Sequence, residues 1–269
     1  GGEDDDSLSK VIQTSDGGYV AVGYTESNSI KYDGNVITEI SRTSTTELSQ
    51  KDAILLKLDE NGNYQWGLRI GGTYDDEIQS VIETSQGNYV ITGKYYSSPF
   101  NFYDRAGIEI KGTMTNAGER DAFVASYSDT GVYQWSQTIG ETNNQDAPDL
   151  TEYSAGIAVA SNSSESARIS LYSLAGSSIK RAFSIGSGSV SKITSLDTSA
   201  DGNIIAGVNY TGKEFDAGIY QVTSTGTSTS IGTTTTRIHS HTNTPPHWKS
   251  SAKGADDVDT QSETAGNAH

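Results

Sequence analysis

The feature that most constrains this chain is an internal repeat. The segment from Gly1 to Gly23 returns, without a gap, as Gly71 to Gly93. The two copies share, in the same order, Gly-Gly, Asp-Asp, Val-Ile, Thr-Ser, Gly, Tyr-Val and Gly. Self-similarity at a fixed period is the signature of architectures that stack copies of one unit. We therefore expect a fold built by repetition.

A second block belongs to the same unit. The segment from Asp52 to Ile70 recurs as Asp121 to Ile139, and both contain Gly-x-Tyr-Gln-Trp. The variable segments 24–50 and 94–120 separate the two blocks and are interpreted as insertions. Two weaker copies follow without the insertion, so the expected units are about 1–70, 71–139, 140–185 and 186–231.

The pattern within a unit predicts four antiparallel strands. Ile54, Leu56 and Leu58 alternate with their neighbours, as in a strand with one buried face. Asp16-Gly17-Gly18 and Asn61-Gly62-Asn63 supply residues that tolerate the positive φ of tight hairpins. Repeated four-stranded units are typical of propeller blades. The sequence thus predicts an all-β, propeller-like array of about four four-stranded antiparallel blades over residues 1–231, with long insertions in the first two.

One known family has similar repeats. The run from Tyr103 to Gly118, continued by Asp121 to Val124, Gly131, Trp135 and Ile139-Gly140, resembles the bacterial β-propeller repeats known as SBBP repeats. The Gly71 to Gly93 block resembles them too. The similarity is specific over residues 1–140 and faint over 141–231. It implies a propeller in an extracellular or cell-surface setting, and no single activity.

Composition excludes several classes of function. A net charge of −16 opposes binding to nucleic acid. No run approaches the roughly 18 apolar residues that a membrane span needs, so we expect no membrane insertion. The chain has no cysteine, which removes disulfides and thiolate chemistry. No nucleophile, phosphate-binding or metalloprotease motif occurs. We expect no catalytic residues, no cofactor, no metal and no enzymatic activity.

The repeated acidic pairs, Asp5-Asp6 and Asp75-Asp76, have two interpretations. Paired carboxylates can bind calcium or act as a general acid and base. Their recurrence in two units favours a structural role, in which they cap backbone amides at blade borders. Trp66 and Trp135 likewise could stack on sugars, but packing between blades is favoured, because a buried indole removes a large area from water.

The first functional hypothesis is a structural subunit of a surface fibre or other polymeric assembly, whose partners are copies of itself. Residues 232–269 form a Thr-rich and polar tail with too few apolar residues for a core. We expect this tail to dock on a neighbouring copy, with Ile238 and Trp248 as anchors.

The alternative hypothesis is a secreted propeller that binds carbohydrate or another surface ligand through its insertions, since function concentrates on loops. Asn162 and Asn209 also fit the N-glycosylation pattern. The aromatic ligand contacts would be Tyr95, Tyr96, Phe100, Phe102 and Tyr103.

Overall fold

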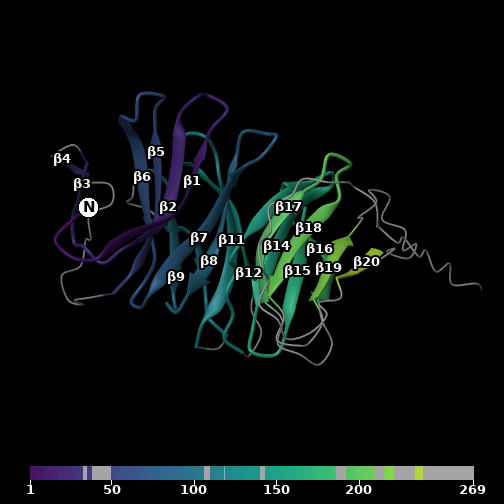
Figure 1. Cartoon of the computed structure of the whole chain (residues 1–269). Helices are drawn as coiled ribbons and strands as arrows, with labels where there is room; N and C mark the ends of the chain where they lie inside the picture. Colours follow the sequence, from purple (N-terminus) through teal and green to yellow (C-terminus); the bar gives the residue numbers. More distant parts are fainter. Residues whose placement is uncertain are drawn as a thin grey trace, which may run out of the picture. The chain divides into compact units, whose positions relative to one another are not determined.

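The structure is a computed structural model in which every described element is a β-strand. Four four-stranded antiparallel sheets and two two-stranded hairpins form it, and the described residues contain no helix (Figure 1). It describes residues 1–32, 35–37, 50–105, 110–117, 119–139, 143–185, 192–209, 215–220 and 234–238.

Each four-stranded sheet corresponds to one predicted repeat and is called a blade. Blade 1 contains β1 (Asp6–Gln13), β2 (Tyr19–Thr25), β5 (Asp52–Leu58) and β6 (Tyr64–Ile70). Blade 2 contains β7 (Asp76–Glu83), β8 (Tyr89–Tyr95), β11 (Asp121–Tyr127) and β12 (Tyr133–Ile139). Blade 3 contains β13 (Leu150–Tyr153), β14 (Gly156–Asn162), β15 (Ala167–Tyr172) and β16 (Ser178–Ile185). Blade 4 contains β17 (Lys192–Thr198), β18 (Ile204–Asn209), β19 (Phe215–Tyr220) and β20 (Thr234–Ile238).

The two insertions form hairpins of their own, between the second and third strands of their blades. In blade 1 the hairpin pairs β3 (Ile30–Tyr32) with β4 (Asn35–Ile37). In blade 2 it pairs β9 (Phe100–Tyr103) with β10 (Ile110–Met114). The isolated bridge between Gly71 and Asn101 connects β9 to the segment after β6, so the second hairpin reaches back to blade 1.

The first strands of the blades lie next to one another. Contacts run from β1 to β7, from β7 to β13 and from β13 to β17. Register shifts occur between Leu8 and Lys10, between Ile78 and Ser80, and between Ile193 and Ser195. A bulge at the same position in three blades bends the first strand and fixes which side chains share a face.

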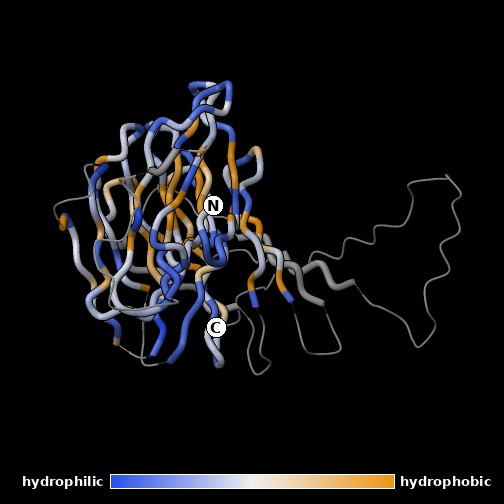
Figure 2. The backbone as a smooth tube through the Cα atoms, turned by 90° about the vertical axis from the view of Figure 1, so that its left-hand side faces the viewer, coloured by the Kyte–Doolittle hydropathy of each residue, from blue (hydrophilic) through white to orange (hydrophobic). Residues whose placement is uncertain are grey.

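The hydrophobic core lies between consecutive blades. One cluster joins Val20 and Val22 of blade 1 to Ile78 and Val81 of blade 2. Equivalent clusters join blade 2 to blade 3 and blade 3 to blade 4. Hydrophobic segments accordingly follow the strands, while hydrophilic residues gather at the turns (Figure 2). Each blade therefore depends on its neighbours for burial, as expected of a repeat fold.

The structure corrects one boundary of the sequence analysis. The predicted tail begins at residue 232, yet residues 234–238 form β20, which pairs with β19 of blade 4. β-branched threonines favour strands, so a Thr-rich run can complete a sheet. The chain divides into two units, residues 1–239 and 240–269, and all described residues belong to the first. Among the described residues there is no helix long and apolar enough to cross a bilayer.

Candidate functional site: the interfaces and open faces of the blades

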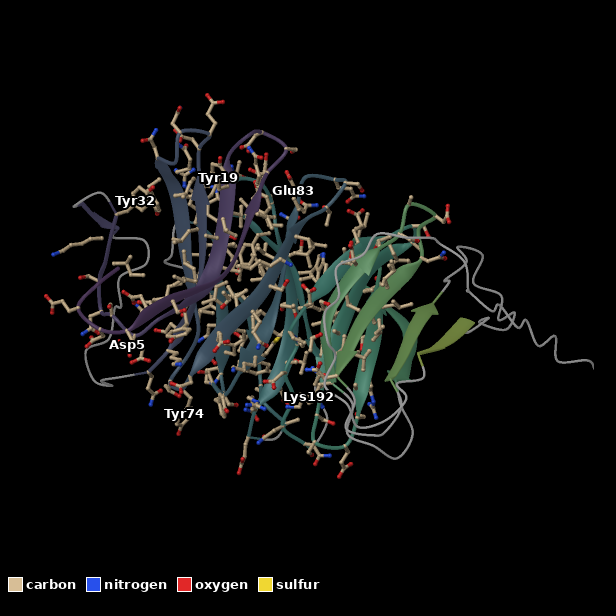
Figure 3. The ribbon with its side chains drawn as sticks, viewed as in Figure 1. Asp5, Tyr19, Tyr32, Tyr74, Glu83 and Lys192 are labelled. Atoms are coloured by element: carbon tan, nitrogen blue, oxygen red, sulfur yellow. The ribbon has the colours of Figure 1, made fainter. Side chains whose placement is uncertain are left out.

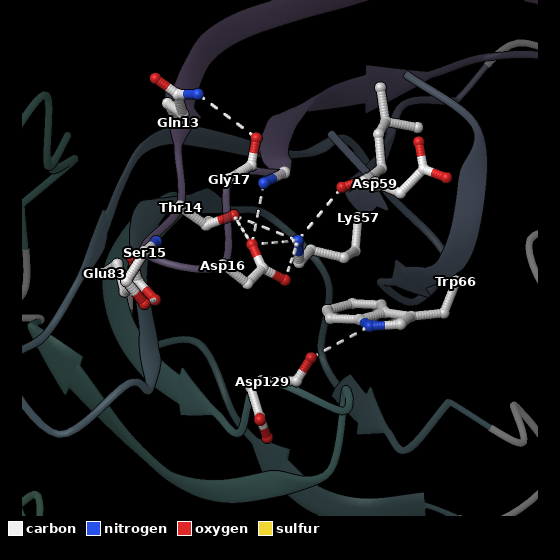
Figure 4. Close-up of polar contacts among 12 residues, drawn as sticks. Gln13, Thr14, Ser15, Asp16, Gly17, Lys57, Asp59, Trp66, Glu83 and Asp129 are labelled. Carbon is white, nitrogen blue, oxygen red and sulfur yellow. Dashed lines mark hydrogen bonds and ion pairs between the residues drawn. The ribbon is translucent and has the colours of Figure 1, made fainter. Parts of the chain in front are cut away.

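A serine–glutamate contact joins the first turn of one blade to the first strand of the next. The Ser15 backbone N–H and hydroxyl donate to the Glu83 carboxylate at 2.6 and 2.7 Å (Figure 4). Ser85 repeats both bonds to Glu152, each at 2.6 Å. The repeat alignment places Gln13 where Glu83 stands, so blade 1 has an amide at this position.

Both predicted tryptophans lie between blades. The Trp66 indole N–H donates to the Asp129 carbonyl at 3.1 Å (Figure 4). The Trp135 indole N–H donates to the Leu174 carbonyl at 3.0 Å. Trp66 is buried and Trp135 is half-buried. The interpretation of these indoles as packing between blades is confirmed.

The turns that receive the indoles contain glycine at positive φ. Gly131 has φ of 78° and Gly176 has φ of 81°. A Cβ at Gly131 would lie 3.1 Å from the Trp66 ring, and one at Gly176 would lie 2.4 Å from the Trp135 ring. Glycine is therefore needed at both positions for two reasons: the turn has positive φ there, and the indole leaves no room for a Cβ.

A buried lysine fixes the first turn of blade 1. The Lys57 ammonium donates to the Thr14 hydroxyl at 3.1 Å, to the Asp16 carboxylate at 3.0 Å and to the Leu58 carbonyl at 3.1 Å (Figure 4). The hydrogen bond from Lys57 lowers the pKa of Asp16 to about 2, with further contributions from Thr14 and Gly18. All three ammonium protons are engaged, which supports a structural role for Lys57.

The second aspartate of each acidic pair caps a backbone amide, in line with the structural role that the sequence predicts. Asp6 accepts the Gly2 N–H at 2.6 Å, and Asp76 accepts the Gly72 N–H at 3.0 Å. Asp76 also accepts the Ser97 N–H at 3.2 Å and the Ser97 hydroxyl at 2.6 Å. Burial raises the pKa of Asp76 to about 8, although the bonds from Ser97 lower it. The carboxylates thus hold the loop that begins each of these two blades.

Polar side chains at one repeat position meet where the first strands converge. Lys10 of blade 1 donates to Ser80 of blade 2 at 2.9 Å and to Asp149 of blade 3 at 3.1 Å. Ser80 donates to the same Asp149 oxygen at 2.6 Å, and the Leu196 N–H of blade 4 donates to its other oxygen at 2.8 Å. One carboxylate therefore links the first strands of all four blades.

The apolar pair on the first strand is buried in every blade except blade 1. Leu8 and Val11 of β1 are 57% and 61% exposed. The equivalent pair in β7, Ile78 and Val81, is fully buried against blade 1. The buried pairs at this position in blades 3 and 4 are Ala147 with Leu150 and Ile193 with Leu196. We call the surface around Leu8 and Val11 the leading face.

The opposite side of blade 4 is open in the same way. Val20, Val90 and Ala158 occupy one repeat position on the second strands and are at most 1% exposed, each packed against the following blade. Ile205 occupies this position in blade 4 and is 39% exposed. We call the surface around Ile205 the trailing face.

The aromatic residues predicted as ligand contacts belong mostly to the core, which corrects that prediction. Tyr95, Phe100 and Phe102 are fully buried. Tyr95 stacks on Phe100 with ring centroids 4.8 Å apart. Tyr96 and Tyr103 are half-buried. The first three belong to the cluster between blades 1 and 2, because β9 pairs with the segment after β6, and they cannot contact a ligand at the surface.

The predicted glycosylation and assembly residues have different outcomes. Asn162 is buried, and its amide exchanges two 2.8 Å hydrogen bonds with the Ile193 backbone, so its prediction as an acceptor is wrong for the folded chain. Asn209 ends β18 and is exposed. Ile238 ends β20 opposite Phe215, within blade 4 rather than in a separate tail. Trp248 lies outside the described residues.

The open faces could not be recognised from the sequence pattern. Leu8 and Val11 match Ile78 and Val81 in type and spacing, and their pattern carries no sign of different exposure. Tyr74 likewise stands out only in the structure, where it is 56% exposed and points away from the sheets (Figure 3). In the described part of the chain, no cluster of three His, Asp or Glu side chains is placed to hold a metal ion.

Comparison with known proteins supports the architecture alone. No family model matches the chain. A stretch of 94 residues, 33% of the chain, is 28% identical to a protein described as an uncharacterized WD repeat-containing protein of Acanthamoeba polyphaga mimivirus. The matched stretch covers 7% of that protein's length. WD repeats form propeller blades of four strands, in agreement with the sheets seen here.

Proposed function

We propose that this chain is a non-enzymatic structural module that assembles with copies of itself into a surface fibre or another polymeric structure. The observation that carries the proposal is the leading face. An apolar pair more than half exposed on blade 1 is the counterpart of pairs that are buried in all three other blades. An apolar surface with an interior-like pattern marks an interaction site.

The arrangement of the polar groups supports a scaffold rather than a catalyst. The repeated carboxylates of Asp6 and Asp76 accept backbone amides, and Lys57 is fully engaged by neighbouring groups. Judged by residue type alone, these side chains were candidates for a catalytic role. An extracellular location is part of the proposal and rests on the resemblance to secreted propeller repeats.

Glycan binding through the insertions has less support. Three of its five predicted aromatic contacts are core residues, which leaves the half-buried Tyr96 and Tyr103. A glycan array would find a ligand if this alternative holds.

The proposal is tested by the mass of the purified chain in solution. Light scattering over a concentration series, with negative-stain imaging of the same samples, should show polymers or closed oligomers. Association should strengthen with added salt, because each copy carries a net charge of −16 and salt screens the repulsion between copies. A chain that stays monomeric at high concentration and high salt would refute the proposal.

A further inference from the structure

We infer that the leading face of one copy binds the trailing face of blade 4 of a second copy, so that blade 4 of one chain stacks on blade 1 of the next. This inference rests on the proposed function and specifies the interface.

The three interfaces within the chain are the template for this contact. In each, one residue at the second-strand position packs against the apolar pair of the following first strand. Val20 shares a core cluster with Ile78 and Val81, Val90 shares one with Leu150, and Ala158 shares one with Leu196. Among the described residues, Ile205 is the exposed residue at the second-strand position, and Leu8 and Val11 are the exposed pair on a first strand. The two open faces therefore carry complementary halves of one repeated interface.

The hydrogen-bonding groups at this interface are compatible with a second copy. Where Glu83 and Glu152 accept serine N–H groups, blade 1 presents the exposed Gln13. Its amide oxygen can accept an N–H but, unlike a carboxylate, adds no negative charge. A neutral acceptor suits an interface between two acidic copies, because it avoids burying another charge.

Within one molecule the leading face and the trailing face do not cover each other. Ile205 keeps 39% of its surface exposed in the same structure in which Leu8 keeps 57%. Because the contact joins different patches on the two partners, it is heterologous, and such contacts build rings or open filaments rather than closed pairs. Association in series, with the leading face of each copy on the trailing face of the next, covers both faces.

The test uses the full chain and two substitutions on opposite faces. Val11→Asp places a charge on the leading face, and Ile205→Asp places one on the trailing face. Val132→Asp is the matched control, because Val132 is 44% exposed in a turn of blade 2, which carries neither of the two faces. Each variant is checked for folding by circular dichroism and thermal unfolding, and its mass is measured by sedimentation.

The expected result is a specific pattern of complementation. Val11→Asp and Ile205→Asp should each weaken association at least 100-fold, while Val132→Asp associates like the wild type. A mixture of the two impaired variants should form one-to-one dimers and nothing longer, because the pair retains one intact leading face and one intact trailing face.

Other outcomes overturn the inference and are distinguishable from failure of the proposed function. If Ile205→Asp still dimerises while Val11→Asp does not, leading faces pair with each other. If both variants assemble like the wild type, assembly uses another surface, and the proposed function stands without this interface. A monomeric wild type overturns both the inference and the proposed function.

Discussion

Alanine substitution of three glycines at one repeat position tests whether contact with the indoles determines how the blades pack. Gly62, Gly131 and Gly176 all occupy the turn before the fourth strand, with φ of 81°, 78° and 81°. Replacing any of them by alanine imposes the same backbone strain, about 1–2 kcal/mol for an L-residue in the left-handed region. Any difference among the three variants must therefore come from the surroundings of the new Cβ.

Those surroundings differ in a graded way. A Cβ at Gly62 would meet only the Tyr32 hydroxyl, at 4.0 Å. At Gly131 it would lie 3.1 Å from the Trp66 ring, and at Gly176 it would lie 2.4 Å from the Trp135 ring, closer than real Cβ contacts allow. Overpacking costs about 1–3 kcal/mol beyond strain. We expect Gly62→Ala to cost about 1–2 kcal/mol and Gly176→Ala about 2–5 kcal/mol, with Gly131→Ala between them.

Equilibrium unfolding in guanidinium, followed by far-ultraviolet circular dichroism, measures these differences. A double-mutant cycle of Gly176→Ala with Trp135→Ala isolates the clash, because removal of the indole relieves it. The double variant should be less destabilised than the sum of the single variants by about 1–3 kcal/mol. The reasoning is refuted if Gly62→Ala and Gly176→Ala agree within about 0.5 kcal/mol, or if the cycle is additive.

Three further predictions concern polar groups. The pKa of the Asp76 carboxyl is near 4 in the unfolded chain and about 8 in the folded chain, so between these pH values only the folded state holds the proton. The stability of the wild type relative to an Asp76→Asn variant should therefore fall as pH rises through this window. In urea titrations the fall should reach up to about 1.4 kcal/mol per pH unit. Removal of the ammonium in Lys57→Met should raise the pKa of Asp16 from about 2 toward 3.8, as read by carboxyl NMR; no shift would contradict the contact. Asn162→Ala leaves the Ile193 N–H and carbonyl without their partner and should cost about 2–4 kcal/mol in denaturant unfolding, whereas substitution of the exposed Asn209 should cost little.

Some residues of the candidate site have roles that depend on contacts within their own loop, and these roles could be predicted from the sequence. Others have roles that depend on a neighbouring blade, and these could not. The capping by Asp6 and Asp76 was predictable, because a carboxylate that precedes a strand finds the amides of its own loop. Phe100 and Phe102 sit in a polar insertion, a sequence context typical of surface loops. They are core residues because β9 returns to blade 1, and that return is a contact between segments far apart in the chain.

The sequence by itself determined the repeat unit, its four strands and the turns that divide them, since alternation and glycine act over a few residues. Gly62 and Gly131 adopt positive φ where the turn pattern requires it. Only the tertiary structure decided which copies of an identical pattern are buried. Leu8 and Val11 have the apolar character and spacing of Ile78 and Val81, yet the first pair is exposed and the second is buried. Burial of a blade face is a property of the adjacent blade, which the residues on that face do not encode.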